Sequence, residues 1–219
     1  VVDTVILNSD AGVDVGAYAE AITITGQAGS NGFSVGNYDL SYVSANLVVS
    51  PRAVTLTASQ QERIYGDAIL LDETAFTVTD LDGDSTLPNG EVIDTVILNS
   101  VSGVYVGTYA DAIAIAGQAG SNGFSLGNYD LSYVTGDLVV NPRAVTLTAL
   151  PQERIYGEAM VLDETAFTMT DLDGDSALPN GEVIDAVILN SGAGVNVGTY
   201  ANAIAITGQA GSNGFSATN

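Results

Sequence analysis

The chain repeats its own sequence at a fixed offset of 91 residues, and this constrains its fold more than any other feature. The segment VVDTVILNS at Val1–Ser9 returns as VIDTVILNS at Val92–Ser100 and as VIDAVILNS at Val183–Ser191. When residues 51–91 are aligned with residues 142–182, only seven of the 41 positions differ. A repeat of this length indicates that one copy is the unit of folding. The sequence therefore predicts an array, in which any active site would have to occur more than once.

The copies are predicted to join at prolines. The segments LVVS and LVVN run directly through Pro51 and Pro142 into RAVTLTA. Proline fixes φ and cannot donate to a strand ladder, so it suits the joint between two domains. We expect three segments: a first copy at 1–50 that is the C-terminal part of an incomplete repeat, a complete second copy at 51–141, and a third copy at 142–219 that lacks its last two strands. No flexible linker separates them, so the joints should be stiff, and we expect the chain to be part of a longer protein.

Apolar residues alternate with a period of two, which is typical of strands. Asn-Gly pairs, which supply the positive φ angles of tight turns, recur between these segments. Six or seven short strands in about 90 residues predict an all-β fold of tandem antiparallel, Ig-like β-sandwich repeats that form an extended rod. The predicted strands are Arg52–Ala58, Ala75–Leu81, Glu91–Asn99, Tyr109–Gly117, Tyr129–Val134 and Asp137–Val140.

The composition excludes several classes of function. The chain has no Cys, His, Lys or Trp, and its four arginines face 26 carboxylates, for a formal net charge of −22. Without these residues it cannot build a disulfide, a thiolate metal site, a His-activated nucleophile or a Schiff base. The negative charge argues against nucleic-acid binding. The sequence contains no run of 18 apolar residues, so membrane insertion is not predicted. No cofactor is expected to be required.

Five motifs in a fixed order carry a family resemblance. They are GNYDLSYVTGDLVV at Gly127–Val140, PRAVTLTA at Pro142–Ala149, RIYG at Arg154–Gly157, GDS at Gly174–Ser176 and VGTY at Val197–Tyr200. This order resembles the tandem MBG/YDG-type domain of large bacterial surface proteins. The resemblance implies a secreted or cell-surface β-sandwich repeat of an adhesin or filamentous-haemagglutinin-like protein, without catalytic activity. It also implies that the partners are neighbouring repeats of the same chain, and that other regions of the parent protein bind a host or environmental surface.

One acidic segment is a candidate calcium site. DLDGDSTLPNGE at Asp80–Glu91 returns with one change as DLDGDSALPNGE at Asp171–Glu182. Acids stand at positions 1, 3, 5 and 12, the spacing that lets oxygens in a tight loop converge on Ca²⁺. Glycine stands at position 4 rather than 6 and proline at position 9, so the alternative is an exposed loop with local Asx turns. The candidate ligands are Asp80, Asp82, Asp84, Glu91, Asp171, Asp173, Asp175 and Glu182.

The tyrosines have two interpretations, and two of the arginines have one. Two tyrosines four residues apart in YDLSYV share a strand face, so the tyrosines could form a sugar-binding surface or pack in the core with their hydroxyls at the rim. The tyrosines concerned are Tyr38, Tyr42, Tyr65, Tyr129, Tyr133 and Tyr156. Arg63 and Arg154 precede the Tyr-Gly pairs and are predicted to pair with nearby carboxylates.

An enzyme would have to use paired carboxylates, as glycoside hydrolases do. Asp72-Glu73 and Asp163-Glu164 are the candidates, but neighbouring residues of a strand point to opposite faces. The predicted function is therefore a non-catalytic structural stalk of a bacterial adhesin. The alternative is a multivalent module whose repeats bind Ca²⁺ or glycans.

Overall fold

The computed structural model describes residues 1–9, 12, 14–100, 103–192, 194 and 196–218. Over these residues the chain forms fourteen strands and four single-turn 3₁₀ segments, with no α-helix. The prediction of an all-β fold is confirmed. No helix in this part of the chain is long and apolar enough to span a membrane.

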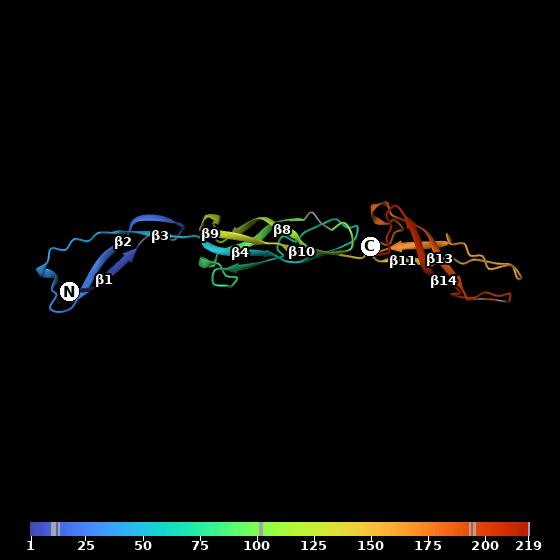
Figure 1. The fold of residues 1–219 in the computed structure, drawn as a ribbon, viewed down its shortest axis with the longest axis horizontal. Coiled ribbons are helices and arrows are strands. Elements are labelled where there is room, and N and C mark those ends of the chain that lie inside the picture. Colours follow the sequence, from blue (N-terminus) through green and yellow to red (C-terminus); the bar gives the residue numbers. More distant parts are fainter. Residues whose placement is uncertain (10–11, 13, 101–102, 193, 195, 219) are drawn as a thin grey trace. The chain divides into compact units, whose positions relative to one another are not determined.

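The described residues form two compact units. The first comprises Val1–Ala58, Phe76–Ile97 and Ile115–Val134. It contains a three-stranded sheet in the order β1-β2-β3 and another in the order β6-β4-β9 (Figure 1). The strands of these two sheets are β1 (Val2–Ser9), β2 (Gly16–Gly29), β3 (Ala45–Val49), β4 (Arg52–Ala58), β6 (Phe76–Asp80) and β9 (Tyr129–Val134).

The second unit comprises Ser59–Ala75, Leu98–Ala114 and Thr135–Asn219. It contains the pairs β11-β12 and β13-β14. It also contains β5, β10 and parts of β8 and β7 from a four-stranded sheet in the order β5-β10-β8-β7. Two of the unit boundaries fall within β7 (Val92–Ser100) and β8 (Gly107–Ser121). The other strands are β5 (Gln61–Ile64), β10 (Gly136–Asn141), β11 (Val145–Ala149), β12 (Phe167–Asp171), β13 (Val183–Ser191) and β14 (Ile204–Ser212). The repeat boundaries at 51 and 142 stay a prediction.

Strands form where the alternating pattern places them. β4 and β9 have the predicted bounds, and the other four predicted segments differ from β6, β7, β8 and β10 by a few residues at their ends. β5 was not predicted, because three of its four residues, Gln61, Glu62 and Arg63, are polar and show no alternation. Its main-chain pairing with β10 makes it a strand.

Two strand pairs are parallel, although the predicted sandwich was antiparallel. β4 pairs with β9 from Arg52↔Tyr129 to Thr57↔Val134, and β10 pairs with β5 from Leu138↔Gln61 to Asn141↔Ile64. Period-two alternation fixes which face of a strand is buried but not its direction. The partners are far apart in sequence, and long connections allow parallel pairing.

Each unit has its own buried side chains. In β4, Val54, Leu56 and Ala58 are buried and alternate with threonines. In β10, Leu138 and Val140 are buried in the same alternating way. The remaining buried apolar residues are Leu87, Ile93, Val96, Ile115 and Tyr129 in the first unit, and Tyr65, Leu98, Ile113, Ile184 and Val187 in the second.

The Asn-Gly pairs form turns as predicted. At Asn122-Gly123, φ is 54° at the asparagine and 90° at the glycine. Asn89 and Asn180 lie in the 3₁₀ segments Pro88–Gly90 and Pro179–Gly181, also with positive φ. Consecutive positive φ angles reverse the chain tightly, and Asn and Gly adopt them most readily. The other 3₁₀ segments are Val35–Asn37 and Leu126–Asn128.

Candidate functional site

The acidic segment is a tight loop that follows a strand. β6 ends at Asp80, whose backbone N–H donates to the carbonyl of Asp84 at 2.8 Å. Gly83 turns the chain with φ of 86° and donates to the carbonyl of Asp80 at 3.0 Å. The second copy of the loop repeats these bonds, from Asp171 to the carbonyl of Asp175 and from Gly174 to the carbonyl of Asp171. Gly83 and Gly174, at position 4 of each loop, are therefore the residues at which the chain turns after the strand.

An arginine from another part of the chain binds each loop, a contact that the sequence did not predict. β4 and β6 are antiparallel with Val54 opposite Asp80, so Arg52 at the start of β4 lies beside the loop. Arg52 Nε donates to Asp80 Oδ2 at 2.8 Å, and its Nη2 pairs with both Asp80 and Asp82. In the other loop Arg143 Nε donates to Asp171 at 2.8 Å, and Arg143 also pairs with Asp173.

The ion pairs hold the first aspartate of each loop in its ionised form. The side chains of Asp80 and Asp171 are 1% and 2% exposed. The hydrogen bond from Arg52 lowers the pKa of Asp80, against a smaller opposing effect of burial. Arg143 lowers the pKa of Asp171 in the same way. The arginine can be found in the sequence because it stands two residues before the valine that pairs with the aspartate. Arg52 precedes Val54, which lies opposite Asp80.

The remaining candidate calcium ligands have separate partners. Asp84 accepts from the backbone N–H of Thr86 at 2.8 Å, and Asp175 accepts from that of Ala177 at the same distance. Asp80 also accepts from the N–H of Asp82 at 2.8 Å, so the loops contain the Asx turns of the alternative interpretation. Within the described residues, no group of three or more acidic side chains is arranged to hold a metal ion. Calcium binding at these loops stays a prediction.

Glu91 and Glu182, the last residues of the two loops, each accept a bond from a tyrosine. The Tyr129 hydroxyl donates to Glu91 at 2.6 Å. The Tyr65 hydroxyl donates to Glu182 at 2.5 Å, and Asn180 Nδ2 donates to that hydroxyl at 3.1 Å. Burial, and then the bond to Glu182, raise the pKa of Tyr65. Burial is also the main reason why the pKa of Tyr129 is raised.

The tyrosines divide into buried and exposed sets. Tyr65 and Tyr129 are buried, and Tyr129 stacks on Phe124 with ring centroids 5.3 Å apart. Tyr133 is 44% exposed and donates to Gln118 at 2.6 Å. The exposed set also includes Tyr38, Tyr42 and Tyr156. The hypothesis of core packing with rim hydroxyls therefore fits only part of the set.

Arg63 and Arg154 differ from their predicted role. Arg63 Nη1 donates to the backbone carbonyl of Asp67, and Arg154 Nη1 donates to that of Glu158 at 3.2 Å. Each arginine thus closes the turn that follows it through a carbonyl oxygen, whereas a carboxylate was expected. Sequence proximity to acids did not reveal this, because the turn directs main-chain oxygens toward the guanidinium.

The candidate catalytic pairs lie in turns, so the argument from strand alternation does not apply to them. Asp72 accepts from both the backbone N–H and the hydroxyl of Thr74, at 2.9 and 2.6 Å. These bonds lower the pKa of Asp72, and equivalent bonds from Thr165 lower that of Asp163. The lowered pKa favours the ionised form of Asp72 and of Asp163, whereas the general acid of a catalytic pair needs a raised pKa.

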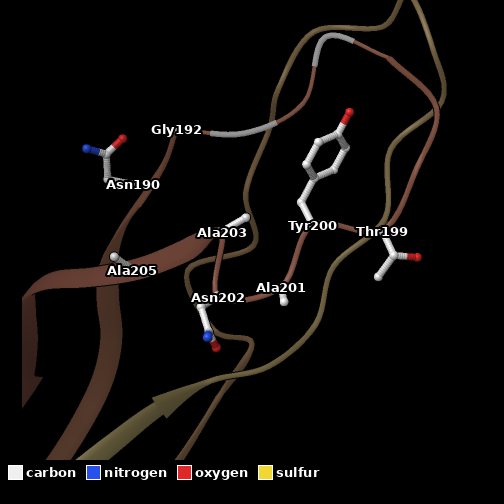
Figure 2. A pocket seen from close by; sticks show the side chains of 8 residues that line it. All are labelled: Asn190, Gly192, Thr199, Tyr200, Ala201, Asn202, Ala203 and Ala205. Carbon is white, nitrogen blue, oxygen red and sulfur yellow. The ribbon is translucent and has the colours of Figure 1, made fainter.

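A hollow of about 630 Å³ lies in the second unit (Figure 2). Its lining carries amide, hydroxyl and small apolar groups without a carboxylate or a cation, and Tyr200 donates its hydroxyl to the carbonyl of Asn196 at 2.9 Å. In the preceding copy, Thr108 and Tyr109 stand at the positions of Thr199 and Tyr200 and pair with Val139 and Leu138 of β10. This part of the hollow therefore matches a position that is paired with a strand in the preceding copy. Its lining residues are Asn190, Gly192, Thr199, Tyr200, Ala201, Asn202, Ala203 and Ala205.

Comparison with known proteins gives one family-model match, over part of the chain. Residues 54–139 match the model of the MBG domain, YGX type. The matched segment contains Tyr65-Gly66 and lies inside the predicted complete copy, whose sequence recurs in residues 142–219. No curated protein and no solved structure matches the chain. The match supports a repeat domain of surface proteins.

Proposed function

We propose that the chain is a structural stalk of a secreted or cell-surface bacterial adhesin. Its tandem Ig-like β-sandwich repeats join end to end without linkers and form an extended rod. The rod performs no catalysis and holds a binding region of the parent protein away from the cell. Its partners along the rod are the neighbouring repeats of the same chain.

The observation that carries this proposal is that carboxylates of the repeated loop bind partners inside the folded chain. Asp80 and Asp171 are buried against Arg52 and Arg143, and the glutamate of each loop accepts from a tyrosine. Groups committed in this way stabilise a domain and are not available to a substrate. The pairing of arginine with the first aspartate occurs twice at an offset of 91 residues, as expected if each repeat performs the same mechanical role. The match to a family of surface-protein repeats supports the same conclusion.

The test is the accessibility of the protein on intact source cells. Antibodies raised against the purified chain should label unpermeabilised cells, and external protease should remove that label. An antibody against a cytoplasmic protein, applied to the same cells, should label only after permeabilisation. Labelling of the chain that requires permeabilisation would refute the proposed location and, with it, the stalk.

A further inference from the structure

Two turns in the second unit lie against each other and belong to different predicted repeats. One is the Tyr-Gly turn of Tyr65-Gly66, which follows β5 in the second copy. The other is the Pro-Asn-Gly-Glu turn of Pro179–Glu182, which precedes β13 in the third copy. Tyr65 is only 3% exposed and donates its hydroxyl to Glu182 at 2.5 Å. Asn180 donates to the same hydroxyl at 3.1 Å, so two residues of the facing turn bond the phenol.

Gly66 is required by this contact for two reasons. Its φ of +87° is one that residues with a Cβ rarely adopt. In addition, a Cβ placed on Gly66 would overlap the Cβ and Cγ atoms of Pro179. Gly157, the equivalent residue of the third copy, has φ of +89° and nothing within 4 Å of an added Cβ. The two glycines therefore share a conformation, and only Gly66 is packed against another turn.

An ion pair flanks the contact. Arg143, which holds Asp171 in the loop that leads to Pro179, also pairs through Nη1 with Asp67 at 2.9 Å. The Arg143 side chain is 7% exposed, so its guanidinium is enclosed between acids of both copies. Enclosed, multiply bonded arginines fix geometry better than exposed single pairs do.

We propose that the Tyr-Gly turn is the docking surface of a repeat, and that its partner is the Pro-Asn-Gly-Glu turn of the repeat that follows it. The hydroxyl of Tyr65 and the flat surface of Gly66 receive the Glu182 carboxylate and the Pro179 ring. This inference does not depend on the stalk function, because it concerns only how one repeat recognises the next.

The third copy presents the same surface without this partner. Its turn has the sequence Arg-Ile-Tyr-Gly, as in the second copy, but Tyr156 is 68% exposed and Ile155 75% exposed. Two contacts distinguish Tyr65 from Tyr156: the Tyr65 hydroxyl bonds the facing turn, and the Tyr65 backbone N–H donates to the Asn141 carbonyl of β10 at 2.9 Å. The docking bond is compatible with the bond that the corresponding glutamate makes inside the second copy. Glu91, at the position of Glu182, accepts from Tyr129 of its own copy, and a carboxylate has two oxygens that can each accept a bond.

The experiment measures the distance across the docked turns in the full chain. The chain has no cysteine, so Thr108→Cys and Thr168→Cys place one nitroxide label on β8 and one on β12, both at exposed positions. Double electron–electron resonance then gives the distribution of distances between the labels. Tyr65→Phe removes only the hydroxyl, and Gly66→Ala adds only the colliding methyl group. Tyr156→Phe and Gly157→Ala are matched controls, because they make the same changes in a turn of the same sequence and backbone conformation.

We expect a narrow distribution in the parent chain, and loss of that narrow peak in Tyr65→Phe and Gly66→Ala. The two controls should keep it. Far-UV circular dichroism checks that each variant retains its strands, and Tyr65→Phe keeps the ring in place if Gly66→Ala fails to fold. The proposal is overturned if Tyr65→Phe leaves the distribution unchanged, or if Tyr156→Phe broadens it to the same extent. Neither outcome bears on where the protein is located, so this test and that of the stalk fail separately.

Discussion

Truncation of one leucine at two equivalent positions gives a direct test of how burial stabilises the repeat. Leu56 in β4 and Leu147 in β11 occupy the same position of RAVTLTA in successive copies. Leu56 is 0% exposed because β4 lies between β6 and β9, whereas β11 pairs with β12 in a two-stranded sheet and Leu147 is half-buried. The local sequence is identical, so any difference between Leu56→Ala and Leu147→Ala comes from the surroundings.

The expected magnitudes follow from the two environments. Full burial of a leucine side chain contributes roughly 1.5–3 kcal/mol, and an enclosed cavity adds to the loss, so Leu56→Ala should cost about 3–4 kcal/mol. Leu147 is partly solvated and its site can fill with water, so no enclosed cavity forms. Leu147→Ala should therefore cost about 1 kcal/mol, which is part of the free energy of transferring a leucine side chain out of water.

The assay is native-state hydrogen exchange, read at the amides of β4 and β11. A chain with two compact units need not unfold in one step, and exchange reports the opening free energy of each strand separately. The amides of β4 in Leu56→Ala should lose at least about twice the opening free energy that the amides of β11 lose in Leu147→Ala. Equal losses at the two sites would refute the argument that burial by β9 distinguishes the copies.

Three further predictions concern the loops. Because arginines hold the pKa of Asp80 and of Asp171 below the usual range, the folded-state values lie below the unfolded ones. The resulting stabilisation is complete above the unfolded pKa of about 4 and is lost as the pH falls toward the folded value. The melting temperature should therefore drop below about pH 4, and Arg52→Gln with Arg143→Gln should flatten that drop; an unaltered pH profile would contradict the role of the arginines. If the loops bind Ca²⁺, millimolar CaCl₂ must raise the melting temperature relative to EDTA, and no shift at saturating Ca²⁺ would end that hypothesis. Tyr129→Phe removes the bond to Glu91 and should destabilise the first unit by about 1.5–3 kcal/mol, as for other hydrogen bonds to charged groups; Tyr133→Phe, which loses a bond at an exposed position, is the control and should cost less.

Much of the fold could be predicted because period-two alternation reports burial directly. β4 and β9 were predicted to the residue, and the turns at Asn89, Asn122, Asn180 and Asn213 have the positive φ that Asn-Gly implies. The parallel pairing of β4 with β9 could not be predicted, since alternation is the same for either strand direction. β5 was missed for a related reason: its strand character comes from pairing with β10, not from its own side chains.

The sequence indicated the acidic loop, but it did not indicate the side chains that bind the loop's carboxylates. The spacing of acids in Asp80–Glu91 identified the loop, yet the cation beside it is Arg52, which lies 28 residues away in sequence and arrives through the β4–β6 register. The sequence indicated a turn at Tyr65-Gly66, but nothing local indicated that the turn would face Glu182, 117 residues further on. Contacts between elements that are distant in sequence depend on tertiary packing, and a single sequence does not encode them in a readable pattern.

Small-angle X-ray scattering of the full chain in solution tests the central claim most directly. A 219-residue chain folded into one compact globule would have a radius of gyration of about 17 Å, and an unfolded one about 51 Å. Repeats joined end to end should give a value clearly between these, with a rod-like scattering curve and a circular dichroism spectrum typical of β-structure. A radius of gyration near the compact value would contradict the account of the protein as an extended array.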